Sequence, residues 1–420
     1  MKILWLSANL LLPLDKGGKL RTWHLMRHLA RRHHITFLSF ADPGTPEAHR
    51  AGMSEVCAEL VTVPRREPAK GSLRFLLDAA SYVVRRLPYA VGKYRSSELR
   101  ARMVDLLATG EFDLVVCDFL APVANVPAQL PCPSVLFTHN VEAEIWRRHA
   151  DTARSPLRKA LLSAQWRRTV RFERDAVRRF DLVLAVSDTD RRTLLDAYGQ
   201  LRHAVHVVPT GVDTRYFADV TGPVRPRHMV FTGSMDWLPN EDGMLYFVRD
   251  VLPLIRREEP EATVAIVGRA PTPAVMKLGS EPGVEVTGRV DDVRPHMAAG
   301  AVYIVPLRIG GGTRLKIFEA MAMGKPVVST TIGAEGLPVE PGADVIVADS
   351  PGKFADAVVR LFRSEAERTR IAEAGRRLVT EQYDWSTVFG HLEQALEAAA
   401  RGSRQHDTAP VSALEFQTRN

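Results

Sequence analysis

Short apolar runs rich in β-branched residues recur along the whole chain, and charged stretches with helical periodicity separate them. Continuous apolar runs of this length are typical of parallel strands buried on both faces, and their alternation with helices predicts doubly wound α/β domains. In the first half the predicted strands cover residues 2–6, 35–40, 60–63, 114–117, 134–138, 182–186 and 205–208. In the second half they cover residues 229–232, 263–267, 284–287, 302–305, 326–330 and 345–347.

A stretch rich in turn-forming residues, 209–226, lies between the two sets of strands. It indicates a domain boundary. We expect a Rossmann-like domain over 1–220, a second over 221–385, a last helix over 386–400 and a disordered tail over 401–420. Ligands of doubly wound sheets bind at the carboxyl ends of the strands, so two such domains should face a central cleft.

Composition indicates a globular protein with an anionic partner. Of the 420 residues, 45% are hydrophobic and 25% charged, and the net charge is +7. Cys57, Cys117 and Cys132 are too few and too irregularly spaced for a disulfide framework or a zinc site, which favours the cytoplasm. No run reaches the roughly 18 apolar residues that a transmembrane helix needs.

A glycine-rich loop follows the predicted strand at 302–305. Gly310, Gly311 and Gly312 precede Thr313, which is a plausible N-cap for a helix with an apolar face. Glycines let an anion approach the backbone closely, and a helix N-terminus offers unpaired N–H groups and a positive dipole end. The loop therefore predicts a phosphate site.

Charged residues at the start of this helix support that interpretation. Arg314 and Lys316 oppose the helix dipole unless an anion is bound nearby, and Glu319 lies on the same side of the helix as Lys316. A carboxylate there could accept hydrogen bonds from a ribose diol. From these residues alone, the alternative is a glycine-rich turn, two solvated basic side chains and a surface ion pair.

Four segments together resemble the family-four retaining glycosyltransferases, whose fold is called GT-B. They are Gly17-Gly18 after the first strand, Thr138-His139-Asn140-Val141-Glu142, Pro209-Thr-Gly-Val-Asp213, and the segment 310–337. The resemblance covers residues 1–395. It is greatest to sugar transferases of bacterial exopolysaccharide and cell-surface polysaccharide clusters.

The resemblance implies how a nucleotide-diphosphate sugar is held. Glu319 matches the family glutamate that binds the nucleotide ribose, and the backbone at Gly312, Thr313 and Arg314 matches the diphosphate segment. The family's first glutamate falls on Gly311, which is a departure. A second departure is the loop 233–240, which lacks the arginine and lysine that many relatives place against the diphosphate. We expect Arg314 and Lys316, together with Arg308, to replace them.

In the first half, the resemblance places Gly17 and Gly18 near the donor phosphates and His139 near the donor sugar, as the catalytic candidate. Asn140 and Glu142 are weaker candidates. The alternatives are a plain turn before a helix for the glycines and a cleft-edge histidine with ordinary partners for His139.

The function implied is sugar transfer to a hydroxyl acceptor, lipid-linked or polysaccharide, with no cofactor and no metal. Two rivals stay open: a nucleotide-sugar 2-epimerase, and a donor-binding subunit without chemistry. No nucleic-acid recognition module is present. Residues 141–180 carry eleven Lys/Arg and five Asp/Glu among aromatic residues. This stretch fits either peripheral contact with the anionic inner face of the plasma membrane or a pair of solvated helices.

Overall fold

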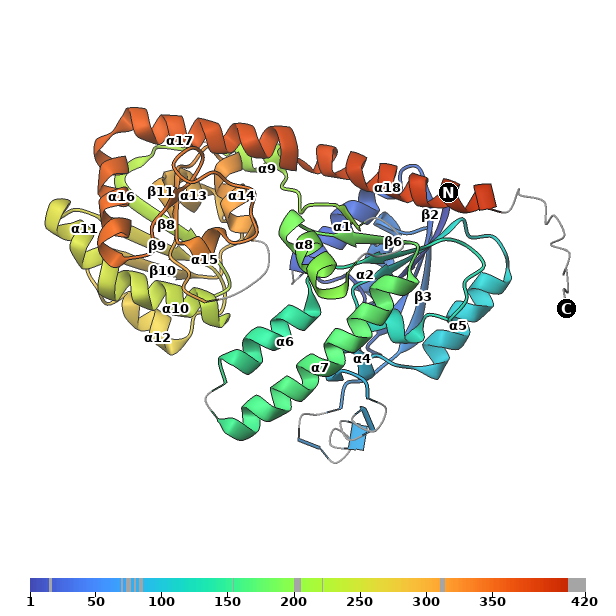
Figure 1. Ribbon diagram of the computed structural model, residues 1–420. Helices are drawn as coiled ribbons and strands as arrows, with labels where there is room; N and C mark the ends of the chain where they lie inside the picture. Colours follow the sequence, from blue (N-terminus) through green and yellow to red (C-terminus); the bar gives the residue numbers. More distant parts are fainter. Residues whose placement is uncertain are drawn as a thin grey trace, which may run out of the picture. The chain divides into compact units, whose positions relative to one another are not determined.

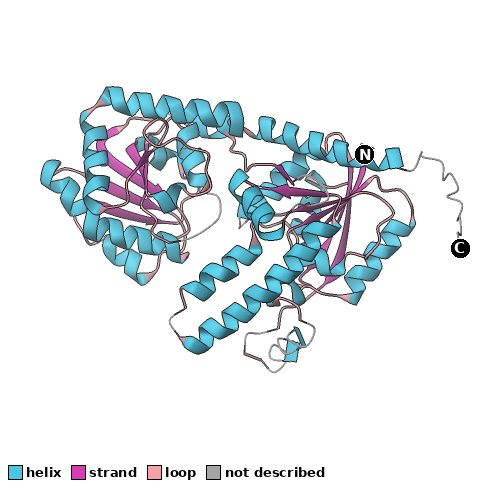
Figure 2. Ribbon diagram, in the orientation of Figure 1, coloured by secondary structure: helices cyan, strands magenta, loops and turns pink. Residues whose placement is uncertain are grey.

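The computed structural model describes residues 1–14, 17–68, 71–72, 77–78, 81–82, 86–153, 155–199, 205–220, 222–309 and 314–406. These residues form two compact units. Unit 1 comprises residues 1–208 together with the chain from Phe389 onward, and unit 2 comprises Pro209–Val388. Both units are α/β, with helices on both faces of a central sheet (Figures 1 and 2).

Unit 1 contains a seven-stranded parallel sheet in the order β3-β2-β1-β4-β5-β6-β7. Its central strands are buried on both faces, which is why their sequences are apolar throughout; Ile3, Leu4, Trp5 and Leu6 of β1 are fully buried. The strands are β1 Lys2–Leu6, β2 His34–Ala41, β3 Glu59–Pro64, β4 Leu114–Asp118, β5 Ser134–Phe137, β6 Leu182–Ala185 and β7 Val205–Val207.

The helices of unit 1 cover this sheet, and several begin at side chains that cap them. Ser96 and Ser187 each accept a hydrogen bond from the third residue of the helix they precede. The helices are α1 Gly17–Leu29, α2 Glu47–Gly52, α4 Tyr89–Gly92, α5 Ser97–Ala108, α6 Glu142–Asp151, α7 Pro156–Arg179 and α8 Asp188–Tyr198, with short 3₁₀ turns at Met53–Glu55 and Ala121–Asn125.

Unit 2 contains a six-stranded parallel sheet in the order β10-β9-β8-β11-β12-β13. The strands are β8 Arg225–Thr232, β9 Thr263–Val267, β10 Val284–Gly288, β11 Gly300–Val305, β12 Val327–Ser329 and β13 Ile346–Val347. The helices are α9 Thr214–Ala218, α10 Leu238–Tyr246, α11 Leu252–Glu258, α12 Pro273–Leu278, α13 Arg294–Ala299, α14 Leu315–Ala322, α15 Thr331–Ala334, α16 Pro351–Arg363 and α17 Glu365–Leu378, with π turns at Phe247–Val251 and Val379–Tyr383.

The last helix, α18 (Trp385–His406), begins in unit 2 and continues in unit 1. In unit 1 it is fixed by Glu393, which pairs with Arg32 at 3.0 Å and with His33 at 3.1 Å, and by Phe389, which stacks on His28. The helix therefore extends into the stretch 401–406 that the sequence assigned to a tail, while residues 407–420 lie outside the described part.

All thirteen predicted strands are present, and two Rossmann-like sheets are confirmed. The division between the units follows Val208, whereas the sequence placed a boundary at 220. None of the described helices is long and apolar enough to cross a bilayer.

Candidate active site

The order of strands in unit 2 locates a candidate site. β8 and β11 are neighbours, but the chain leaves them in opposite directions, toward β9 and β10 on one side and toward β12 and β13 on the other. This is the topological switch point, where the loops after two adjacent strands separate and ligands of such sheets bind. The loop after β8 leads into α10, and the loop after β11 leads into α14.

Helix α14 begins one residue later than the sequence predicted. Leu315 is its first residue and Arg314 occupies the N-cap position without a capping side-chain hydrogen bond, so the assignment of Thr313 as N-cap was wrong. Gly310, Gly311, Gly312 and Thr313 lie outside the described residues. The helix buries Ile317, Phe318, Ala320, Met321 and Ala322, which fixes the direction of its N-terminus.

Lys316 lies at the switch point and not on an open surface. Its Nζ donates to Oδ1 of Asn240 at 2.9 Å and lies 4.0 Å from the centre of the Phe231 ring on β8. A Cβ on Gly233 would come within 2.8 Å of this ammonium, so the absence of a side chain there makes room for it. The interpretation of Lys316 as a solvated basic residue is therefore wrong.

Lys316 and Glu319 form a partly buried pair of opposite charges. Burial lowers the pKa of Lys316 to about 7 although Glu319 opposes the shift, and burial raises the pKa of Glu319 to about 7 although Lys316 opposes it. Among the described residues, no side chain donates a hydrogen bond to the Glu319 carboxylate. An anion binding beside Lys316 and a hydroxyl donor beside Glu319 would relieve both desolvated charges.

The two predicted arginines behave differently. Arg314 is buried, at 3% exposure, and its guanidinium lies 5.8 Å from the ring of Trp237 in the loop after β8. Arg308 pairs with Asp242 of α10 through two hydrogen bonds, at 2.6 and 3.0 Å, and lies over the Tyr246 ring. The structure thus places Arg314 and Lys316 against the loop 233–240, whereas Arg308 already has a carboxylate partner.

A second polar cluster lies at the switch point of unit 1, between β1 and β4. His139, which follows β5, contacts the Asp118 carboxylate through Nε2 at 2.7 Å and the Arg21 guanidinium through Nδ1 at 3.3 Å. Thr22 donates to the other Asp118 oxygen at 2.9 Å. Phe119 stacks on the imidazole, with ring centres 3.7 Å apart.

These contacts fix the protonation state and orientation of His139. Because Arg21 can only donate, Nδ1 accepts, and Nε2–H donates to Asp118. Burial lowers the pKa of His139, against the attraction of Asp118. With both nitrogens engaged and 6% exposure, the imidazole is a positioned neutral ring that has no nitrogen available for proton transfer.

Gly17 and Gly18 open α1 at the same edge of the sheet, and they differ in their surroundings. A Cβ on Gly18 would lie 2.6 Å from Cζ of Phe119, whereas a Cβ on Gly17 would meet no atom within 4 Å. Gly18 is therefore required for the Phe119–His139 stack.

We expect Gly18→Ala to destabilise the protein by roughly 1–3 kcal/mol, because the ring of Phe119 must move. Gly17→Ala, at an open helical position, should be neutral or stabilising by up to about 1 kcal/mol. The midpoint of urea unfolding measures both. Equal effects of the two substitutions would contradict the structural role given to Gly18.

Of the weaker candidates, Glu142 lies beside a buried carboxylate. Its backbone N–H donates to Glu173 of α7 at 2.8 Å, and Glu173 also accepts from Ala143 N and from the Tyr198 hydroxyl. Burial, and then the charge of Glu173, raises the pKa of Glu142 to about 7. In the described part of the chain, no hydrogen bond or ion pair joins Glu142 or Asn140 to the His139 cluster.

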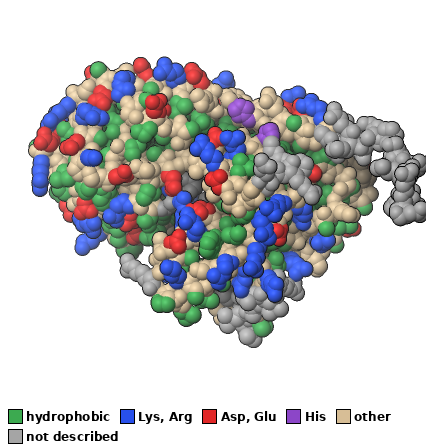
Figure 3. All heavy atoms as spheres, viewed as in Figure 1, with side chains coloured by type: hydrophobic (Ala, Val, Ile, Leu, Met, Phe, Trp, Pro, Cys, Tyr) green, Lys and Arg blue, Asp and Glu red, His purple; other side chains and the backbone are tan. Residues whose placement is uncertain are grey.

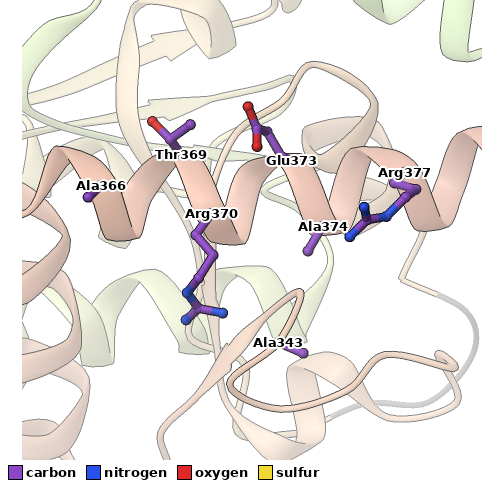
Figure 4. Close-up of a pocket in the computed structure, with 7 residues that line it drawn as sticks. All are labelled: Ala343, Ala366, Thr369, Arg370, Glu373, Ala374 and Arg377. Atoms are coloured by element: carbon purple, nitrogen blue, oxygen red, sulfur yellow. The ribbon is translucent and has the colours of Figure 1, made fainter.

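A hollow elsewhere in unit 2 is lined by residues of α17 and by Ala343 (Figure 4). Arg370 points from α17 toward the loop and donates to the Gly342 carbonyl at 3.1 Å. Because none of its lining residues belongs to the cluster around Lys316, this hollow is not part of the candidate site. Across the described residues, no group of three or more His, Cys, Asp or Glu is arranged to hold a metal ion.

Two family models match the chain. Residues 16–216 match the model described as Glycosyltransferase Family 4, and residues 226–364 match the one described as Glycosyl transferases group 1. The chain is a glycosyltransferase. The two matched segments contain both switch-point clusters, so the cluster around Lys316 lies in the group 1 segment and the cluster around His139 in the family 4 segment.

Relatives of this glycosyltransferase are distant. MMP alpha-(1->4)-mannosyltransferase of Mycolicibacterium hassiacum is 26% identical over 319 residues, which are 73% of this chain and 75% of the relative. An uncharacterized 44.6 kDa protein in the cps region of Klebsiella pneumoniae is 23% identical over 39% of this chain and 45% of its own length. The crystal structure of Anabaena HepE with UDP and glucose has the same fold, with a TM-score of 0.63 at 17% identity over 95% of this chain and all of that one.

Sequence reasoning missed three residues of these clusters. Asn240 holds the Lys316 ammonium, and Asp118 and Arg21 hold His139. A signal existed for Asp118, because it ends a fully apolar strand at the sheet edge where Gly18 and His139 were already placed.

Proposed function

We propose that this glycosyltransferase moves a sugar, with retention of configuration, from a nucleotide-diphosphate sugar to a hydroxyl acceptor. The observation that carries the proposal is the Lys316–Glu319 pair at the start of α14. It offers an ammonium for the diphosphate and a carboxylate without a described donor for the ribose diol. The donor site is assigned to unit 2, with the glycine-rich loop 310–313 and Arg314 contributing to diphosphate binding.

The proposed reaction needs no covalent intermediate with the protein. In retaining transfer of this kind, the leaving diphosphate assists the incoming hydroxyl on the same face of the sugar. The protein must hold the donor and stabilise the negative charge that grows on the leaving phosphate, which a fixed ammonium and backbone N–H groups do well in a desolvated site. His139 contributes as a positioned neutral ring in unit 1, held by Asp118 and Arg21.

The biological setting we propose is synthesis of an exopolysaccharide or another cell-surface glycan. Two relatives support it: one is named as a mannosyltransferase, and the other is encoded in a cps region. The acceptor is then a growing polysaccharide or a lipid-linked sugar.

Incubating the purified full chain with UDP- and GDP-sugars, with and without glycan acceptors, tests the proposal. We expect one donor to stabilise the protein to heat, by about 2.7 kcal/mol at a hundred times its dissociation constant. We also expect its sugar to appear on an acceptor. An altered sugar formed from donor alone would indicate an epimerase, and tight donor binding without any transfer would indicate a binding subunit. Either result would contradict the proposal.

Donor affinity should fall as the pH rises above about 7. The protonated Lys316 binds the diphosphate, and the bound diphosphate raises the pKa of Lys316 above its free value of about 7. The donor affinity is therefore highest at pH values below the pKa of Lys316 in the free protein. Above that pKa the affinity falls by at most tenfold per pH unit, until the pH exceeds the pKa of Lys316 in the complex. Glu319, whose pKa is also raised to about 7, completes its ionisation by about pH 8, so the slope between pH 8 and pH 9 belongs to Lys316.

Calorimetric titration of a nucleotide sugar between pH 7 and pH 9 measures this slope. Lys316→Arg is the matched control, because a guanidinium stays protonated throughout the range and should remove the pH dependence. A slope that persists in Lys316→Arg would assign the titration to another group.

A further inference from the structure

Helices α6 and α7 of unit 1 form an antiparallel hairpin (Figure 1). The N-terminal part of α7 is its most exposed stretch. The buried residues of α7 are Thr169, Glu173, Ala176 and Val177, all in its second half. Every described residue from 155 to 161 is exposed. The hairpin therefore ends in a tip where, among the described residues 155–161, every side chain faces solvent.

Large apolar side chains lie on this tip. Leu157 is 72% exposed and Leu161 is 62% exposed, the two highest values among the exposed large hydrophobic residues of α7. They are four residues apart and so share one face of the helix. Exposing two leucines on one face costs free energy that burial in an apolar partner would recover.

Cations follow the leucines on the same face. Arg168 and Arg171 continue the spacing of Leu157, Leu161 and Ala164 along the helix, so the stripe changes from apolar to basic toward the body of the unit. About 10 Å separates Leu161 from Arg168 along the helix axis, close to the depth that separates lipid phosphates from the upper acyl chains.

Nothing in the described structure neutralises this charge. The segment Pro156 to Phe172 contains five Lys/Arg and no Asp or Glu. No ion pair joins any of these five to a described residue; they are Arg158, Lys159, Arg167, Arg168 and Arg171. Lys and Arg side chains gather over the course of α7 on the face seen in Figure 3.

We propose that the tip of α7 docks on an anionic phospholipid bilayer, with Leu157 and Leu161 inserted among the upper acyl chains and the arginines against the phosphates. A second copy of the chain is a poor occupant, because it would bring five further cations against these five. Nucleic acid is also a poor occupant, because its phosphate backbone offers no apolar surface for the two leucines. Of these three partners, only an anionic bilayer offers acyl chains for the leucines and phosphates for the arginines. The contact would hold the enzyme where a lipid-linked acceptor lies. The docking surface consists of α7 residues in unit 1, whereas the donor site is assigned to unit 2.

Co-sedimentation of the purified full chain with vesicles tests the proposal, without donor and at ~0.15 M ionic strength. We expect binding to phosphatidylcholine vesicles that contain phosphatidylglycerol and none to phosphatidylcholine alone. Leu157→Ser with Leu161→Ser should weaken binding roughly tenfold or more. Arg168→Gln with Arg171→Gln should weaken it roughly 25-fold.

Matched controls lie on α5 of the same unit. Arg100 and Arg102 are exposed, so Arg100→Gln with Arg102→Gln removes the same charge away from the tip, and Val104→Ser replaces one apolar side chain there that is 44% exposed. They should leave vesicle binding within twofold of the wild type. The replaced residues are exposed except Arg168, which is half-buried, so thermal unfolding and donor-induced stabilisation should change little in any variant.

Three results would overturn the proposal. They are the absence of sedimentation with anionic vesicles, equal losses in the tip and α5 variants, and a dimer in equilibrium sedimentation that the leucine variant dissociates. Because donor-induced thermal stabilisation is measured separately on the same variants, a failure of membrane docking is distinguishable from a failure of the proposed enzymatic function.

Discussion

Replacing Lys316 with methionine should lower kcat/KM for sugar transfer roughly 100- to 1,000-fold, the loss found when one donor that stabilises a transition-state charge is removed. The ammonium is held beside the carboxyl end of β8 by Asn240 and by the open space over Gly233. Methionine keeps the length of the chain and removes the charge. The leaving diphosphate would then develop its charge in a desolvated site with one cation fewer.

Stability should change little: among the described residues the hydrogen bond lost is the one to Asn240, worth about 1 kcal/mol, and Glu319, whose pKa burial raises to about 7, can take up a proton once the ammonium is gone. Steady-state transfer kinetics and a thermal melt measure the two effects. Lys353→Met is the control, since Lys353 is an exposed lysine of the same unit on α16. If kcat/KM of Lys316→Met stayed within threefold of the wild-type value, and that of Lys353→Met were unchanged, Lys316 would not be a donor-binding residue.

Replacing Asp118 with asparagine should destabilise the protein by roughly 3–5 kcal/mol, because it leaves a buried guanidinium without its countercharge. Asp118 is fully buried, and Arg21 is 6% exposed. Burial lowers the pKa of Arg21 to about 10, and Asp118 is the first of the charges that oppose this shift. The substitution also removes a charged acceptor from His139 Nε2–H and from the Thr22 hydroxyl.

A double-mutant cycle isolates the charge effect. Arg21→Met in the Asp118→Asn background removes the unpaired charge, so the double variant should be more stable than Asp118→Asn alone. Urea unfolding gives the free energy of unfolding of the wild type, the two single variants and the double variant. Additive losses would show that Arg21 and Asp118 act independently, contrary to the buried network described here.

The sheets could be predicted from the sequence because parallel strands buried on both faces must be apolar throughout. Val302 to Val305 of β11, all at most 1% exposed, illustrate the rule. The domain boundary was less accurate, since the segment after Val208 is rich in turn formers over many residues and any of them could end a domain. The end of α18 at His406 was missed because its last turns lack apolar periodicity.

The candidate site was predictable only where chemistry follows from local sequence. Lys316 and Glu319 were found because they are three positions apart on one helix and so lie on the same side of it. Asn240, 76 residues away, holds Lys316 through a contact that no local pattern encodes. The same holds for Arg21, which reaches His139 across 118 residues. Arg308 was grouped with the donor ligands by proximity in sequence, yet the fold pairs it with Asp242.

A crystal structure of the full chain with its nucleotide sugar bound would test the donor site most directly. We predict the diphosphate within hydrogen-bond distance of Lys316 Nζ and of the backbone N–H groups at the start of α14, and the ribose hydroxyls on the Glu319 carboxylate. A diphosphate bound elsewhere, with Lys316 still held by Asn240 alone, would contradict this account.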